Sequence, residues 1–268
     1  MAAATLESLL TVPGASRSRI SRILAKDADP LDQLWACPWK LLDTPDPWQR
    51  KVLSDPRSNW ILNASRQSGK TTVVSAQCLW EAMCCGSFVL ILSASEPQAF
   101  EFFERVISLY RKWPLVEAVD EPTKSELRLV NGGRILAKAN NEATVRVYSS
   151  VGRLVIDEAS RVPDTLYGAV TPMLAVSGGR KTLLSTPFGK RGFFYNSWTR
   201  GKNFRREEVP WTRCPRLTPQ FIEGERAEHG DLWVQQEYEC KFLDTVSGVF
   251  DVTAFADLID HDMETLQW

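Results

Sequence analysis

The stretch Trp60-Ile61-Leu62-Asn63-Ala64-Ser65-Arg66-Gln67-Ser68-Gly69-Lys70-Thr71 decides the fold of this chain. Its first three residues are apolar and predict a short buried strand. Residues 63–69 are typical of a turn, and a helical pattern runs from Lys70 to about Cys85. A loop between a strand and a helix can present backbone N–H groups and the positive helix end to a polyphosphate. The sequence therefore predicts a phosphate-binding loop that ends at Gly69-Lys70-Thr71.

The chemistry of this loop follows from its last residues. Lys70 is expected to reach the β- and γ-phosphates of a nucleotide, and Thr71 offers a hydroxyl to Mg²⁺, a hard cation that prefers oxygen ligands. The match to the pattern G-x-x-x-x-G-K-[ST] is imperfect, because Ala64 stands where the first glycine is expected. Taken alone, the motif is also compatible with a helix that simply starts at a surface lysine.

Beyond the loop, short apolar strands alternate with helices. Strands are predicted at residues 60–62, 88–92, 154–156 and 182–184. Helices are predicted from Ser95 onward and over about 163–174. The segments 126–130 and 134–138 flank Asn131-Gly132-Gly133 and predict a β-hairpin beside the main sheet. This alternation favours an α/β fold of the P-loop NTPase class, with a mostly parallel central sheet flanked by helices.

Changes in composition and hydrophobic pattern along the chain suggest the domain organisation. We expect an N-terminal arm at 1–44, the ATPase core at 45–209, a small helical lid subdomain at 210–250 and a C-terminal linker at 251–268. A short helix is predicted near residues 6–10, and Thr218 is a candidate N-cap in the lid. The acidic residues of the tail are expected to be solvated.

Composition excludes several classes of protein. The chain has 268 residues, 44% hydrophobic and 24% charged, and its 32 basic and 33 acidic residues give a net charge of −1, so any polyanion site must be local. No apolar run is long enough to span a bilayer, and we expect no membrane association. Six cysteines without C-x-x-C spacing and two histidines argue against zinc and favour a reducing, cytoplasmic compartment.

A second chemical motif lies downstream of the loop. Leu154-Val155-Ile156 is an apolar strand that ends in the adjacent carboxylates Asp157 and Glu158. Asp157 could hold the Mg²⁺ shell near Thr71, while Glu158 could polarise the water that attacks a γ-phosphate. Solvated acids at a strand end are common in isolation. Together with a strand, G-K-T loop and helix in the expected order, they predict an ATPase.

With these motifs, residues 45–250 resemble the ATPase domain of the large terminase subunit of tailed bacteriophages, the motor that packages viral DNA. Ser65 to Thr71 is similar to the family's deviant phosphate loop, in which an R-Q pair precedes G-K and the leading glycine is often absent. Leu154 to Ser160 resembles its acidic motif, and Leu184-Ser185-Thr186-Pro187 its coupling motif, which senses the γ-phosphate. Pro47-Trp48-Gln49 resembles its adenine-recognising motif.

The resemblance also implies roles for individual residues. Arg146 is similar to an arginine that reaches into a neighbouring subunit's site, although Val147 replaces the glycine that usually follows it; Arg66, inside the phosphate loop, is the competing candidate. Glu158 is the implied catalytic residue. The implied nucleotide-binding residues are Gln49, Ser65, Arg66, Gln67, Ser68, Gly69, Lys70, Thr71, Thr72, Asp157 and Thr186. Thr71 and Asp157 are the implied Mg²⁺ ligands.

One segment is a candidate for DNA contact. Residues 188–206 contain aromatic side chains, no acid and six cations, namely Lys190, Arg191, Arg200, Lys202, Arg205 and Arg206. Cations can follow phosphates while rings stack on bases. The alternative is that the rings belong to the core and the cations are ordinary surface residues.

The resemblance implies an ATP- and Mg²⁺-dependent motor that moves double-stranded DNA into a capsid. It also implies a homo-oligomeric ring, a portal protein and a small terminase subunit as partners, and work at the procapsid in the bacterial host cytoplasm. We expect no DNA cleavage, because the sequence shows no nuclease domain with its several aspartates. Two alternatives stay open: a helicase-like DNA-dependent ATPase, and a non-catalytic ATP-binding prophage remnant.

Overall fold

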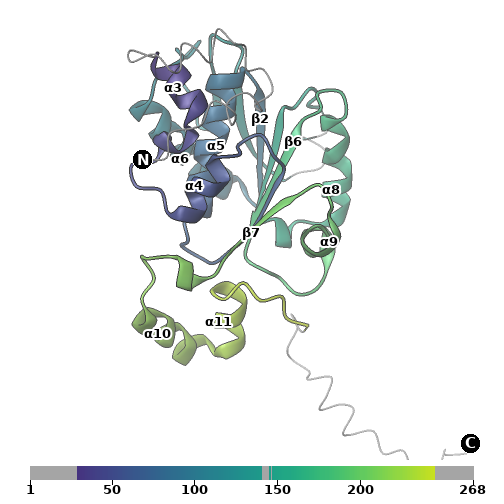
Figure 1. Ribbon diagram of the computed structural model, residues 1–268. Helices are drawn as coiled ribbons and strands as arrows, with labels where there is room; N and C mark the ends of the chain where they lie inside the picture. The colour runs from purple at the N-terminus through teal and green to yellow at the C-terminus, as the bar shows by residue number, and fades with distance from the viewer. Residues whose placement is uncertain (1–28, 141–144, 146, 245–268) are drawn as a thin grey trace, which may run out of the picture.

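The computed structural model describes residues 29–140, 145 and 147–244, and its core is a seven-stranded sheet with the order β3-β4-β2-β5-β6-β1-β7 (Figure 1). All neighbouring strands are parallel except β3 and β4, which form an antiparallel hairpin. The strands are β1 (Trp60–Ala64), β2 (Phe88–Ser93), β3 (Glu126–Arg128), β4 (Arg134–Ala139), β5 (Arg153–Asp157), β6 (Arg180–Ser185) and β7 (Arg205–Val209). The predicted α/β class with a mostly parallel sheet is confirmed.

Helices cover both faces of this sheet (Figure 1). They are α3 (Pro30–Ala36), α4 (Pro47–Leu53), α5 (Lys70–Cys85), α6 (Glu96–Lys112), α8 (Asp164–Val170), α9 (Gly192–Arg200), α10 (Pro219–His229) and α11 (Asp231–Glu237). Short 3-10 turns are η1 (Pro38–Leu41), η2 (Ala159–Arg161), η3 (Thr171–Leu174) and η4 (Trp211–Arg213). Thr218 caps α10 as predicted, because its side chain accepts a hydrogen bond from the Phe221 N–H.

Two hydrophobic cores form because successive strand residues point to opposite faces. In β2, Val89 and Ile91 pack with α3 to α6, whereas Leu90 and Leu92 pack with α8 and α9. Both sets are buried, so the central strands read as continuous apolar runs, as expected for a parallel sheet covered on both sides. This explains why the strands could be read from sequence.

Two features of the sheet differ from the sequence expectations. The hairpin does not merely lie beside the main sheet, since β4 pairs with β2 in parallel and is part of it. Strand β7, which pairs with β1, is absent from the sequence prediction. Its sequence Arg-Arg-Glu-Glu-Val is polar because β7 is an edge strand in which only Glu207 and Val209 are buried.

The N-terminal part of the described chain packs closely on the core. Residues 29–44 belong to the expected arm, yet Leu34, Trp35 and Leu41 are buried, and the Trp80 indole N–H donates to the Leu34 carbonyl at 3.1 Å. The predicted helix at 6–10 and the tail acids lie outside the described residues. At the other end, α10 and α11 form a separate small helical layer beyond the end of β7 (Figure 1).

Among the helices of residues 29–140, 145 and 147–244, none has the length and apolar character needed to cross a bilayer.

A buried ion pair fixes α5 against the sheet. Arg153 on β5 and Glu81 on α5 are both fully buried, with 2.9 Å between Nη2 and Oε2. Arg153 also donates to the Thr182 hydroxyl at 2.9 Å and to the Pro56 carbonyl. A buried charge keeps its ionised form only when such partners replace water. The pair therefore links α5, β5, β6 and the segment before β1.

We predict that Arg153→Ala lowers the free energy of unfolding by about 3–5 kcal/mol, because it leaves the buried Glu81 carboxylate with a single, more distant arginine. Urea denaturation followed by circular dichroism measures the change. Arg128→Ala, which removes an exposed ion pair on β3, is the matched control and should leave the midpoint nearly unchanged. Equal midpoints for the two variants would contradict the assigned role.

Candidate active site

The candidate site lies where three neighbouring parallel strands end. Because β5, β6 and β1 are adjacent and parallel, their C-terminal ends bring together the loop at 65–69, the acid pair at 157–158 and the turn at 185–187. In open α/β sheets, ligands bind in the crevice at this edge. The three motifs that the sequence predicted to act together are therefore neighbours in space.

The loop between β1 and α5 has a closed, strained conformation. Gly69 has a φ of 90°, and a Cβ built there would lie 2.7 Å from the Gln49 amide nitrogen, so only glycine fits. Gln67 also has a positive φ, of 55°. The buried Ser68 hydroxyl donates to the Ser65 carbonyl at 2.7 Å, and the Ser65 N–H donates to Val209 at 2.9 Å. Internal bonds thus hold the loop in a phosphate-loop shape.

Lys70 and Glu158 meet at the base of this loop. The Lys70 ammonium lies 3.7 Å from Oε1 of Glu158, and its side chain is 10% exposed. Glu158 has a left-handed backbone, with a φ of 48°. Such strain in a non-glycine residue often marks a functional position. The Ser185 hydroxyl donates to its Oε2 at 3.3 Å, which ties the acid to the end of β6.

Asp157 is the second acid and is nearly buried. Burial raises the pKa of its carboxyl to about 7, helped by the charge of Glu158 and opposed by that of Lys70. The Glu158 N–H donates to its Oδ1 at 3.0 Å. A buried carboxylate with an elevated pKa gains from a nearby cation. The Asp157 carboxylate, and the hydroxyl of Thr71 in the first turn of α5, are hard oxygen donors of the type that Mg²⁺ prefers.

Gln49 binds to the phosphate loop itself. Its buried amide accepts from the Asp46 N–H at 2.9 Å and donates to the Gly69 carbonyl at 3.3 Å. Arg216, which the sequence analysis missed, holds Asp46 with 2.6 Å between Nη2 and Oδ2 and donates to the Ser68 carbonyl at 2.9 Å. Helix α4, the loop and the segment before α10 are thereby joined.

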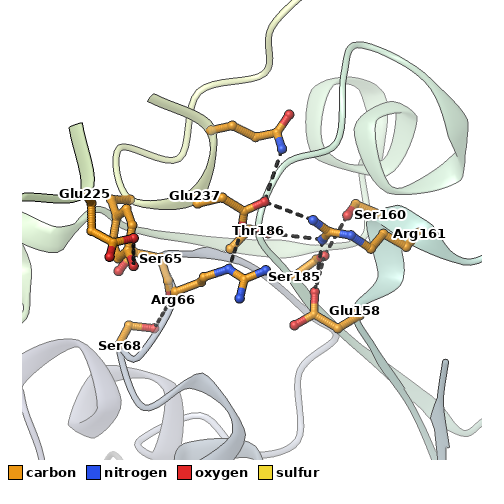
Figure 2. Close-up of polar contacts among 12 residues, drawn as sticks. Ser65, Arg66, Ser68, Glu158, Ser160, Arg161, Ser185, Thr186, Glu225 and Glu237 are labelled. Atoms are coloured by element: carbon orange, nitrogen blue, oxygen red, sulfur yellow. Dashed lines mark hydrogen bonds and ion pairs between the residues drawn. The ribbon is translucent and has the colours of Figure 1, made fainter. Parts of the chain in front are cut away.

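Glu237, at the end of α11, was also missed and connects the other motifs (Figure 2). This fully buried carboxylate accepts from Arg66 at 2.8 Å, from Arg161 at 2.9 Å and from the Thr186 hydroxyl at 3.0 Å. Burial alone would raise its pKa, but the hydrogen bonds and the positive charges of the arginines lower it below the ordinary value. Helix α11 is thus bonded to the phosphate loop, to the residue that follows the acidic motif and to the coupling motif.

The remaining predicted residues are placed as follows. Thr71 and Thr72 are half-buried in the first turn of α5, and Gln67 is exposed on the loop. Arg66 is half-exposed and turned toward Glu237, as Figure 2 shows. Arg146 lies outside the described residues.

The basic segment 188–206 is divided by the fold. Lys190 and Arg191 precede α9, at the C-terminal end of β6, whereas the other four cations follow from the end of α9 and lie where β7 begins. Helix α9 has nine residues and so separates the two groups by about 13 Å. Among the rings, Phe193 and Phe194 are buried, and Phe193 stacks on Tyr167 with 4.1 Å between centroids. The two groups of cations therefore cannot form one compact patch.

A phosphate loop whose lysine meets an acidic strand end, at the C-terminal edge of a parallel sheet, defines the class of P-loop nucleoside triphosphatases. Within this class, the family model described as terminase large subunit, T4likevirus-type, N-terminal, matches residues 61–257, and the chain belongs to this family. Membership assigns it ATPase activity and a DNA-packaging motor function.

Solved structures agree with this fold. The large terminase ATPase domain of Thermus phage P74-26 is 23% identical, with a TM-score of 0.64 over 76% of this chain and 97% of that one. The ADP complex of a large terminase from another thermophilic bacteriophage is 12% identical, with a TM-score of 0.58 over 80% and 53%. The HK97 bacteriophage large terminase is 13% identical, with a TM-score of 0.60 over 74% and 51%.

The chain spans about half the length of the latter two proteins. No curated protein sequence matches it.

We predict that Glu237→Gln destabilises the protein by about 1–3 kcal/mol at neutral pH, because two arginines lose their buried counter-charge. The folded-state pKa of Glu237 is lowered, so its contribution is complete above the ordinary pKa and is lost as pH falls through the lowered value. The free energies of urea unfolding of wild type and Glu237→Gln should therefore differ by a constant amount from about pH 8 to about pH 5 and converge in stronger acid.

The exposed Glu228→Gln is the control for this change, since it removes a carboxylate from the same pair of helices. A difference between wild type and Glu237→Gln that persists unchanged in strong acid would show that the charge of Glu237 is not what stabilises the contact.

Proposed function

We propose that the chain is a Mg²⁺-dependent ATPase that uses hydrolysis to move double-stranded DNA into a viral capsid. The observation that carries this proposal is the 3.7 Å approach of Lys70 to Glu158, which joins the phosphate loop to the acid motif in one site. The proposal is confined to ATP hydrolysis and includes no DNA cleavage.

The phosphate loop is proposed to bind the triphosphate. Backbone N–H groups of Gly69, Lys70 and Thr71, at the start of α5, are suited to phosphate oxygens, and the positive end of the helix adds to the attraction. Lys70 would exchange Glu158 for the β- and γ-phosphates. Thr71 and Asp157 would hold Mg²⁺, which, when bound, neutralises the charge that develops on the phosphates.

Glu158 is the proposed general base. Its carboxylate is 25% exposed, so water can reach it, and Ser185 and Arg161 orient its Oε2 at 3.3 and 3.4 Å. Once Lys70 turns to the phosphates, the Glu158 carboxylate is free to accept a proton from the attacking water. Gln49 would contact the adenine edge with the second N–H of its amide.

Thr186 and Glu237 offer a route from the nucleotide to the lid. The Thr186 hydroxyl donates to Glu237, and Arg161 donates to both. A γ-phosphate near the ends of β5 and β6 would compete with Glu237 for these donors and for Arg66. We propose that nucleotide state thereby changes how firmly α11 is held. Arg66 acts in cis, and Arg146 is the candidate to act on a neighbouring subunit.

The wider setting is also proposed from the family. An arginine that acts between subunits requires an oligomer, for which we propose a homo-oligomeric ring, and the proposed partners are a portal protein, a small terminase subunit and double-stranded DNA. With these partners, the chain would work at the procapsid in the bacterial host cytoplasm. A large terminase of the same fold has been solved with ADP, which supports nucleotide binding by this chain.

Steady-state ATP turnover over a wide range of protein concentration tests the function, with Lys70→Ala as the blank. We expect a specific rate that rises with concentration, because a shared site forms only in the oligomer. A measurable rate that stays flat would favour a self-sufficient, helicase-like site. A rate no higher than the blank, with DNA and Mg²⁺ present, would contradict the proposed activity.

Glu158→Gln is expected to retain nucleotide affinity while turnover falls by about 10²–10⁴-fold, because the amide keeps the shape of the side chain but cannot accept the proton. Fluorescent-nucleotide titration and phosphate release measure the two quantities. Glu104→Gln, an exposed change on α6, is the control. Equal turnover in wild type and Glu158→Gln would rule out the proposed base.

Mixed oligomers test the trans arginine. Arg146→Ala and Lys70→Ala should each be inactive, but a mixture should regain part of the turnover, because some interfaces then pair an intact loop with an intact arginine. Mixtures of Arg66→Ala with Lys70→Ala should show no rescue, since both residues belong to one loop. No recovery in the first mixture would assign the arginine role to Arg66.

A further inference from the structure

A hollow of the molecule lies at the edge of the sheet opposite the candidate active site. Its volume is about 440 Å³, and it is lined by residues 57–59, 178–180 and 202–205. These segments lead into β1, β6 and β7, which are neighbours in the sheet, so the hollow lies at the N-terminal ends of three parallel strands. Strand β1 has five residues and separates it from the phosphate loop by about 16 Å. We call it the basic pocket.

Positive charge dominates this pocket. Its lining includes Arg57, Arg180, Lys202 and Arg205 and contains no acidic residue. Two nearby carboxylates offset part of this charge. Asp55 pairs with Arg205, and the buried Glu81 lies 3.4 Å from Arg180 but is shared with the fully buried Arg153.

The crowding of like charges is visible in Arg180. Its pKa is lowered by burial and also by the positive charges of Arg57 and Arg153, despite the opposing charge of Glu81. Lys202 is exposed at the rim and makes no ion pair with any residue in the described ranges. An anion would therefore be attracted to this pocket without first displacing an internal partner of Lys202.

The pocket wall is held by Asn59. Its amide donates to the Asn203 carbonyl at 3.1 Å and accepts from the Lys181 N–H at 2.7 Å, so one side chain joins the start of β6 to the segment before β7. The N–H groups of Gly179, Arg180 and Arg205 donate to carbonyl oxygens of the protein. These backbone donors are committed to the fold, so a ligand would have to be bound by the side-chain cations.

This division of donors distinguishes the pocket from the phosphate loop. A compact polyphosphate is bound by converging backbone N–H groups, as at the start of α5, whereas a nucleic-acid backbone is followed by spaced lysine and arginine side chains. The cations here come from three separate segments, and the Arg205 side chain is 64% exposed. The observations thus favour an extended polyanion.

We propose that the basic pocket binds the phosphate backbone of double-stranded DNA through Arg57, Arg180 and Lys202. This inference rests on the proposed DNA-translocating function and adds a contact site at the sheet edge away from the nucleotide. It also joins Lys202 and Arg205 of the sequence-predicted basic segment to Arg57 and Arg180, which that segment does not contain. Arginine forks suit phosphate oxygens, and Lys202 adds a mobile charge at the rim.

The test compares three double variants of the full chain, each of which neutralises one arginine and one lysine. The pocket variant combines Arg57→Gln with Lys202→Gln. A second variant combines Lys190→Gln with Arg191→Gln and alters the opposite edge of the sheet. The third combines Arg111→Gln with Lys124→Gln, which are exposed cations outside the pocket and outside that edge. Fluorescence anisotropy with a duplex of about 30 base pairs, between about 50 and 200 mM salt, gives the affinity and its salt dependence.

We expect the pocket variant to bind the duplex about 10- to 30-fold more weakly, with the slope of log affinity against log salt reduced by about two, because two phosphate contacts are lost. The Arg111/Lys124 variant should behave as wild type, and ATP turnover without DNA should be unchanged in this variant and in the pocket variant. A pocket variant equal to the Arg111/Lys124 variant would overturn the proposal, as would a wild-type chain that binds no duplex.

Two further measurements make the outcome unambiguous. If the double variant at the pocket unfolds at lower temperature, the single change Lys202→Gln replaces it, with an expected slope reduction of about one. Tripolyphosphate titrated into Lys70→Ala tests a compact ligand. If Lys202→Gln abolishes the binding of tripolyphosphate to this variant but leaves the duplex affinity unchanged, the pocket would be reassigned to a small polyphosphate. Loss of turnover with duplex binding intact would instead disprove the ATPase proposal alone.

Discussion

The parallel pairing of β5, β6 and β1 is the constraint on which the site depends. Each of these strands ends at the same edge of the sheet, so the phosphate loop after β1, the acids after β5 and the coupling turn after β6 are brought together by backbone hydrogen bonds. The register is fixed because both faces of the strands are buried, and a shift by one residue would exchange the two hydrophobic cores. The chemistry of the site is thus a consequence of how the sheet packs.

Helix α11 is attached to this edge through charge. Glu237 is the buried carboxylate at which Arg66, Arg161 and Thr186 converge, and each donor comes from the end of a different strand or the turn that follows it. Because a phosphate offers the same donors an alternative acceptor, the contact that holds α11 is also one that nucleotide can weaken. Arg216 makes a comparable link on the other side of the loop, through Asp46 and Ser68.

The two edges of the sheet differ in how their charges are paired. The chain as a whole is nearly neutral, yet the N-terminal edge of β6, β1 and β7 gathers arginines and lysines, with Asp55 and the shared Glu81 as partial counter-charges. The opposite edge carries the phosphate loop and acids that are paired with cations, such as Glu158 with Lys70 and Glu237 with Arg66. Strand β1 runs directly between the two edges, so a motor built on this sheet would have its nucleotide and its DNA contact at the two ends of one rigid strand.

The sequence by itself determined the fold class, the strands of the central sheet except β7, and the residues of the loop and acid motif. These depend on local patterns: apolar runs, glycine at a left-handed position, and carboxylates at a strand end. Only the tertiary structure decided the partners of Glu237, the bond from Gln49 to Gly69, and the division of the basic segment into two groups. Arg66 and Glu237 are 171 residues apart in the chain, and no periodicity or motif encodes such a pairing. Strand β7 and the basic pocket could not be predicted from the sequence either. Their polar residues acquire a role only when β1, β6 and β7 lie side by side.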